Sequence, residues 1–149
     1  MNDIKKISSL HSTPEESSGF LLWRVSTKWR SSIEDILKPL NLTHPQFVVL
    51  ATVWWLTKSS ANVSQAEIGR HAGLDPNTTS QILRGLETKA FVARKRSADD
   101  RSKYPTLTIP GAECLARALP AVELADAQFF SVLNHDESTM LMKILQKLI

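Results

Sequence analysis

The sequence predicts a mainly α-helical fold that carries one small β-hairpin. Apolar residues recur with helical spacing along most of the 149-residue chain. Residues that cap helices stand directly before several of these stretches. Two short strand-like runs, at 91–96 and 104–108, flank a polar, turn-forming segment at 97–102. A chain of this length suits one domain, or one small domain with flanking helices.

The first predicted helix covers residues 13–38 and is unusually apolar. Thr13 is expected to cap it, with Pro14 at the first helical position and Glu16 completing a capping box. Pro39 is expected to end it. The helix has more apolar surface than one core face requires, so we expect it to pack against a helix of another subunit.

Three shorter helices are predicted at 43–57, 64–72 and 75–89. Thr43 with Gln46, and Ser64 with Glu67, have the spacing of capping boxes. Gly73 separates the last two helices by a tight turn. Beyond the hairpin, one helix is predicted from Thr108 and a last one from 134 onward. The apolar stripe of the last helix consists of Met140, Leu141, Ile144, Leu145 and Leu148.

The order helix, tight turn, helix and basic hairpin is typical of a winged helix-turn-helix. On the second helix, Thr79, Ile82, Leu83 and Leu86 are expected to face the core. The opposite side carries hydroxyl, amide and guanidinium groups, which suit contacts with base edges in the major groove. These residues are Asn77, Thr78, Ser80, Gln81 and Arg84. The alternative is a surface helix that is merely polar, but residues 76–83 contain no Lys or Glu.

Basic residues are concentrated near the hairpin. The net charge is only +3, yet residues 84–103 hold seven Lys/Arg and three Asp/Glu. The hairpin contributes Arg94, Lys95, Arg96, Arg101 and Lys103. These side chains are predicted to bind phosphates, and an arginine at the tip could enter a narrow minor groove. The alternative for the charge alone is a solvated surface.

Several motifs in order resemble the MarR family of bacterial regulators. They are the run 42–47 (LTHPQF), the run 75–80 (DPNTTS), Leu86-Glu87, Asp99-Asp100-Arg101, and Leu107-Thr108 with Gly111. The resemblance covers about residues 15–149. It implies a homodimer of winged-helix subunits whose first and last helices interlock, with 13–40 and 110–149 for dimerisation and 41–109 for DNA binding. Residues 1–12 show no periodicity and are predicted to form a disordered tail. Members of the family typically repress genes from a pseudo-palindromic operator in double-stranded DNA.

The resemblance also assigns residues. It places the recognition helix at 77–84, and it gives Asp99 the role of orienting Arg101 toward the minor groove. The chain departs from the family at three positions. Gln81 and Ser102 stand where arginines are common, and Ala90 stands where glycine is frequent. A left-handed conformation at Ala90 would cost about 1 kcal/mol.

The family's effectors are small phenolic or lipophilic ligands, or oxidants of a thiol. The resemblance places a candidate ligand pocket between the dimer helices and the winged domain. Trp23, Trp29, His44, Phe47 and Trp54, with Trp55, could border it. The alternative is that the tryptophans fill the dimer core and that His44 lies on the surface. Cys114 is the single cysteine, and we expect it to be an inert buried thiol rather than a redox sensor.

The sequence offers no support for other classes of function. No catalytic triad, phosphate-binding glycine loop, carboxylate pair or metal-ligand spacing stands out, so neither an enzyme nor a cofactor is expected. No apolar run approaches the ~20 residues of a membrane span. A cytoplasmic protein is therefore predicted. The alternative that stays open is a winged-helix module that binds protein instead of DNA.

Overall fold

The computed structural model describes residues 7–96 and 103–149. The predicted wing residues Asp99 and Arg101 lie outside the described residues. The elements in chain order are η2 (Pro14–Glu16), α1 (Ser18–Leu37), η3 (Lys38–Leu40), α2 (His44–Thr57), α3 (Gln65–Ala72), α4 (Pro76–Thr88), β1 (Val92–Arg96), β2 (Lys103–Leu107), α5 (Ile109–Phe129) and α6 (His135–Leu148). The predicted class, mainly α-helical with one hairpin, is confirmed.

The start of the first helix differs from the prediction. Thr13 makes no capping hydrogen bond, and residues 14–16 form a short 3-10 turn instead of the first α-helical turn. The backbone of Ser17 is extended, and its hydroxyl accepts the Phe20 N–H, so α1 begins one turn later. Glu16 does not reach back to Thr13; its carboxylate accepts the N–H of Ser12. The prediction of one helix from Thr13 is therefore wrong, because a better cap lies four residues further on.

The other helix starts agree with the sequence. The Thr43–Gln46 and Ser64–Glu67 capping boxes are both present. Asp75 caps α4 through the N–H of Thr78, and Thr108 caps α5 through the N–H of Gly111. Asn134 and Glu137 form a further capping box at α6.

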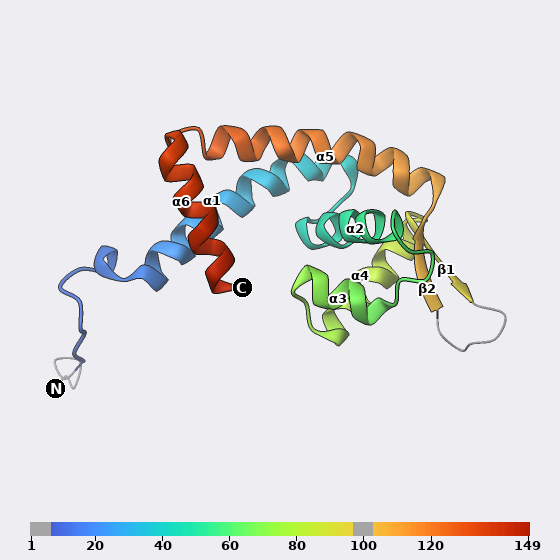
Figure 1. The fold of residues 1–149 in the computed structure, drawn as a ribbon, viewed down its shortest axis with the longest axis horizontal. Coiled ribbons are helices and arrows are strands. Elements are labelled where there is room, and N and C mark those ends of the chain that lie inside the picture. The colour runs from blue at the N-terminus through green and yellow to red at the C-terminus, as the bar shows by residue number, and fades with distance from the viewer. Residues whose placement is uncertain (1–6, 97–102) are drawn as a thin grey trace, which may run out of the picture.

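The helices form two groups that share one core. α5 runs along the whole molecule, from the hairpin to α6, and α1 packs beneath it (Figure 1). The second group, at the N-terminal end of α5 and away from α6, consists of α2, α3, α4 and the hairpin (Figure 1). The fully buried side chains come from both groups: Ile33 and Leu37 of α1, Leu50 and Val53 of α2, Ile68 of α3, and Leu83 and Leu86 of α4. The position of α4 is therefore fixed against the long helices.

The hairpin is a two-stranded antiparallel sheet. Val92 pairs with Leu107, Arg94 with Pro105, and Arg96 with Lys103. β2 packs against α2 and α3, and β1 follows α4 directly. Within residues 7–96 and 103–149, no helix combines the length and the apolar character that a membrane crossing requires.

Candidate nucleic-acid interface

α3 and α4 are joined by a tight turn at Gly73. Gly73 adopts φ +69°, a left-handed conformation that glycine reaches without steric cost. The N–H of Leu74 donates to the carbonyl of Gly69 at 2.8 Å and closes the turn. A Cβ at Gly69 would lie 2.7 Å from Thr79 Oγ1, so the two helices cross at very short range. The sequence thus folds 65–88 into a helix-turn-helix.

The predicted polar face of α4 is partly exposed, and the predicted core face is turned inward. Thr79, Leu83 and Leu86 are buried, and Ile82 is half-buried, as the pattern predicted. Of the five candidate base-contacting residues, Asn77, Gln81 and Arg84 are exposed, and Thr78 and Ser80 are half-buried. Arg84 Nη2 donates to Ser80 Oγ at 3.1 Å, which holds the guanidinium along the helix surface. All five candidate residues belong to α4.

The N-terminus of α4 is not a free anion site. Asp75 Oδ1 accepts the N–H of Thr78 at 2.9 Å, and Asp75 Oδ2 accepts the hydroxyl of Thr78. These hydrogen bonds lower the pKa of the Asp75 carboxyl below its ordinary value, so the cap stays ionised at neutral pH. A phosphate at this end would meet a carboxylate, and the exposed side chains of α4 must supply the attraction instead.

The basic residues of the hairpin separate into two groups. Arg94 turns inward: its side chain is only 16% exposed, with Nε 2.9 Å from Glu87 Oε1 and Nη1 donating to Gln65 Oε1 at 3.2 Å. It therefore ties β1 to α4 and α3, a role that the charge pattern did not predict. Lys95, Arg96 and Lys103 lie on the strands that approach the hairpin tip, and the structure describes their backbone only.

Of the candidate ligand-pocket residues, Trp29 and His44 lie in contact, and the others are placed separately. Trp29, half-buried on α1, donates its Nε1–H to Asp126 Oδ1 at 2.7 Å. Its ring meets the buried His44 edge to face, with 4.9 Å between the centroids. Phe47 is in the core, whereas Trp23 lies exposed on α1. The surface position expected for His44 as the alternative is wrong, because the ring is only 7% exposed.

The remaining aromatic and thiol groups lie elsewhere. The Lys58 ammonium covers the ring of Trp54, 3.7 Å from its centroid, at the opposite end of α2 from His44. Trp55 beside it is exposed. Cys114 is buried, as expected, with Sγ 3.7 Å from the carbonyl of Leu40, and burial raises the pKa of its thiol.

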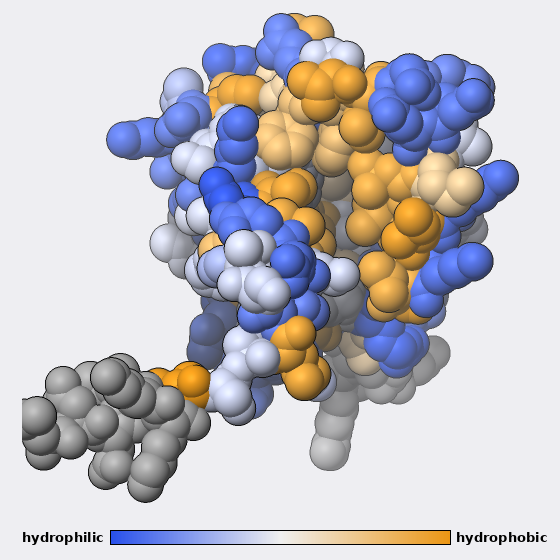
Figure 2. Space-filling model, turned by 90° about the vertical axis from the view of Figure 1, so that its left-hand side faces the viewer, coloured by the Kyte–Doolittle hydropathy of each residue, from blue (hydrophilic) through white to orange (hydrophobic). Residues whose placement is uncertain are grey.

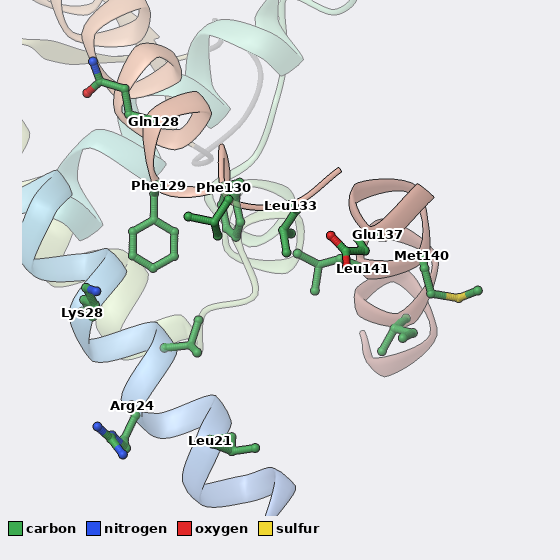
Figure 3. A pocket seen from close by; sticks show the side chains of 13 residues that line it. Leu21, Arg24, Lys28, Gln128, Phe129, Phe130, Leu133, Glu137, Met140 and Leu141 are labelled. Atoms are coloured by element: carbon green, nitrogen blue, oxygen red, sulfur yellow. The ribbon is translucent and has the colours of Figure 1, made fainter. Parts of the chain in front are cut away.

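An apolar groove of about 970 Å³ lies between α1, the end of α5 and α6. Figure 3 shows Phe129, Phe130 and Leu133 facing Leu21 of α1 and Leu141 of α6 across it. None of the predicted pocket residues lines this groove. On this side of the molecule, apolar side chains gather between hydrophilic borders (Figure 2). The apolar stripe of the last helix was the sequence signal for it.

A helix-turn-helix with an exposed polar second helix, followed by a hairpin, defines the winged helix-turn-helix class of DNA-binding transcriptional regulators. Comparison with known proteins agrees with this class. The sequence model of the MarR family matches residues 42–103. The uncharacterised HTH-type transcriptional regulator YdcH of Bacillus subtilis is 32% identical over 131 residues, which span 87% of this chain and 89% of that one.

A mycobacterial relative is similar in both sequence and structure. The HTH-type transcriptional repressor Rv2887 of Mycobacterium tuberculosis is 35% identical over 87% of this chain and 91% of its own length. Its crystal structure with salicylic acid matches with a TM-score of 0.66 at 36% identity, over 89% of this chain and 96% of that one. Its complex with DNA matches with a TM-score of 0.64 at 33% identity, over 89% and 97%. The chain belongs to the MarR family, and it is a DNA-binding transcriptional regulator.

Proposed function

We propose that this regulator is a homodimeric repressor that binds a pseudo-palindromic operator through α4 and the hairpin of each subunit. The observation that carries the proposal is the polar face of α4, where amide, hydroxyl and guanidinium groups lie together on a helix that packs closely against α3. A two-fold dimer would place two such helices in successive major grooves, about one helical turn apart. The relative Rv2887 is a repressor with a DNA-bound structure.

The contacts divide by chemistry. Asn77 and Gln81 would pair with adenine, and Arg84 with guanine, while Thr78 and Ser80 would bind either bases or phosphates. Lys95, Arg96 and Lys103 would bind phosphates, and Asp99 would orient Arg101 toward the minor groove. Arg94 is left out of this interface, because its guanidinium is already paired with Glu87.

Dimerisation is assigned to residues 13–40 and 110–149, DNA binding to 41–109, and 1–12 are assigned to a tail. The support is the apolar surface that α1, α5 and α6 expose around the groove. No residue of α6 is buried, and Ile144, Leu145 and Leu148 are 47%, 40% and 71% exposed. An apolar patch of this kind on a small protein marks an association surface. A second copy, with the same patch, is the occupant that closes a two-fold assembly.

A small aromatic or lipophilic ligand is the proposed effector. The support is the salicylic acid complex of Rv2887 and the joint of α1, α2 and α5, where Trp29, His44 and Asp126 meet. A ligand there would act between the dimer helices and α4. Salicylate that changes neither the tryptophan fluorescence nor the affinity for operator DNA would count against it. The protein is also proposed to act in the cytoplasm and to have no enzymatic activity.

The interface can be tested with duplexes selected from a random pool by the wild-type protein. The logarithm of the affinity should fall linearly with the logarithm of the salt concentration, because phosphate binding releases counterions. Arg101→Ala should weaken binding to all duplexes alike and lower the salt slope by about one. Gln81→Ala should relax the preference at one base pair per half-site, with a loss of about 1–3 kcal/mol in discrimination.

Gln146→Ala, on the exposed surface of α6, is the matched control and should change neither quantity. If wild-type affinity were insensitive to salt, or if the Arg101 and Gln81 variants both bound as the wild type does, this interface would be refuted. A winged-helix module that binds protein would give those results.

A further inference from the structure

The C-terminal turn of α4 is held from two sides. On one side it meets the junction between η3 and α2, where the chain leaves α1. On the other it meets the start of α5. These neighbours are parts of the long helices, so the contacts at this turn connect the DNA-contacting helix to the proposed dimerisation region.

Lys89 makes the contact with the α1–α2 junction. Its ammonium donates to the carbonyl of Asn41 at 2.6 Å and to Gln46 Oε1 at 2.7 Å, and its side chain is half-buried. Gln46 Oε1 also accepts the N–H of Thr43 in the capping box of α2. The amide of Gln46 in turn lies against Gly85, where a Cβ would come within 2.9 Å of Nε2. The side chain of the residue that caps the C-terminus of α4 therefore joins the end of η3 and the start of α2.

The position suits a cation. Lys89 stands at the C-terminal end of α4, and the Asn41 carbonyl stands at the end of η3, which continues α1. The carbonyl of Asn41 lies at the C-terminal end of η3, where partial negative charge attracts the ammonium, whereas Gln46 lies in the first turn of α2, whose partial positive charge opposes it. Both hydrogen-bond acceptors are neutral oxygens, and hydrogen bonds from a charged donor to such groups are stronger than neutral ones.

The start of α5 holds the other side of the turn. The hydroxyl of Thr108 donates to the carbonyl of Ala90 at 2.6 Å, and the N–H of Thr108 donates to the carbonyl of Phe91 at 3.2 Å. Gly111 lies so close that a Cβ there would be 1.9 Å from Phe91 O. Leu83 and Leu86 hold α4 in the core, so the Lys89 contact acts on how the C-terminal end of α4 lies against the junction between α1 and α2.

We propose that Lys89 is a positioning residue that sets the orientation of α4 relative to the dimer helices, and with it the distance between the two recognition helices of the dimer. This inference rests on the proposed homodimer. Lys89 follows the last residue of α4, at the opposite end of the helix from Asn77, and its ammonium is bound by Asn41 and Gln46. It acts on DNA through the placement of α4, without touching a phosphate.

The experiment uses the full-length protein and duplexes that carry the selected half-site as an inverted repeat, with the spacing varied in single base pairs around one helical turn. Wild-type protein should prefer one spacing sharply. Lys89→Met should bind that spacing about tenfold more weakly, as expected for the loss of charged hydrogen bonds. Its preference for one spacing should be weaker than that of the wild type. The dependence of its affinity on salt concentration should stay unchanged.

Three further variants separate positioning from charge and from stability. Lys38→Met removes the same charge from exposed η3 and should keep the wild-type spacing preference. Lys89→Arg should restore much of the preference. Gln46→Glu keeps the capping box and gives Lys89 a charged acceptor. As a single variant it should sharpen the spacing preference. In the double variant with Lys89→Met it should have no such effect, because the ammonium is absent. Circular dichroism and thermal melting check that each variant is folded.

A readout without DNA completes the test. Spin labels at Thr88→Cys in a Cys114→Ser background report the distance between the two α4 helices of the dimer. Lys89→Met should broaden this distance distribution, and Lys38→Met should not. A lowered salt slope would make Lys89 a phosphate contact and overturn the inference, as would unchanged spacing preference in a folded Lys89→Met protein. If the wild type itself showed no spacing preference, the proposed homodimer on an inverted repeat would fall first.

Discussion

Trp29, His44 and Asp126 join three helices through a few polar atoms. The indole N–H of Trp29 is bound to the Asp126 carboxylate, and the ring of Trp29 lies edge-on to His44. Because His44 is the first residue of α2, the contact joins the winged domain to α1 and α5. Burial lowers the pKa of His44, and the charge of Arg30 lowers it further, whereas Glu34 and Asp126 raise it. The net direction favours the neutral imidazole.

Stability should therefore depend on pH through His44. Its folded-state pKa lies below the ordinary value of 6.5, so the unfolded chain binds the proton more tightly. The contribution of neutral His44 is present above pH 6.5 and is lost as the pH falls below it. The slope for one proton is at most about 1.4 kcal/mol per pH unit. Urea unfolding at a fixed protein concentration should show lower stability at mildly acidic pH than at neutral pH.

His44→Gln should flatten this dependence, whatever its effect on stability at neutral pH. His71→Gln is the control, because His71 is exposed on α3 and its replacement should leave the slope unchanged. An equal slope in wild type and His44→Gln would show that His44 does not control it.

At the scale of the elements, left-handed residues end three helical segments. Asn41, Gly73 and Ala90 have φ of 56°, 69° and 58°. At α4, the N–H of Phe91 donates to the carbonyl of Leu86, and the N–H of Ala90 donates to that of Glu87, which is the Schellman pattern. The chain thus turns from α4 into β1 at a residue with a Cβ, as the departure at Ala90 suggested.

Ala90→Gly should stabilise the protein. Glycine adopts a positive φ without the steric penalty of alanine, so the free energy of unfolding should rise by about 1 kcal/mol. Chemical denaturation measures this directly. Ala93→Gly provides the comparison within β1 and should lower stability by about 0.5–1 kcal/mol, since glycine weakens a strand. A destabilised Ala90→Gly would mean that the alanine methyl contributes packing that outweighs the strain.

At the scale of the whole molecule, one apolar face has no cover in a single chain. The groove between α1, α5 and α6 continues into the exposed stripe of α6, and it lies away from the hairpin (Figures 1 and 3). The core that the described residues share fixes α4, and this second apolar surface is available to a partner. With α4 and the proposed association surface at different ends of α5, both would be able to act at once.

Leu145→Lys should convert the proposed dimer into monomers. An ammonium group in the stripe would lose its hydration on burial, and an apolar surface offers no partner for the charge. Analytical ultracentrifugation should show the change in mass. Affinity for an inverted repeat should fall by a factor on the order of 100 or more, because the second half-site no longer binds intramolecularly.

Gln146→Lys adds the same charge on the opposite side of α6 from the stripe and should remain dimeric. If Leu145→Lys stayed a dimer with wild-type affinity for DNA, the α6 stripe would not be the association surface.

Local chemistry alone determined most of the elements. Capping boxes at Thr43 and Ser64, the turn at Gly73 and the polar face of α4 depend on residues within a few positions of each other, so the sequence pattern was sufficient to predict them. Competition between two nearby caps was harder to judge, and Ser17 prevailed over Thr13. The candidate base-contacting residues on α4 follow from helical spacing, and the exposure of Asn77, Gln81 and Arg84 agrees with it.

Only the tertiary structure showed the contacts between residues that lie far apart in the sequence. Arg94 was predicted to bind phosphates, but the approach of Glu87 and Gln65 holds its half-buried side chain as a tie between the hairpin and the helices. The tryptophans were candidates either for a ligand pocket or for the dimer core, and the structure places Trp23 and Trp29 on α1 and Trp54 and Trp55 near the C-terminal end of α2. Lys89 carried no signal in the sequence, since its partners Asn41 and Gln46 are more than 40 residues away. The hydrogen-bond partners of a helix cap lie within a few residues in the sequence, so the sequence pattern predicts them. The partners of a residue that joins two helices are distant in the sequence and come close only in the folded chain.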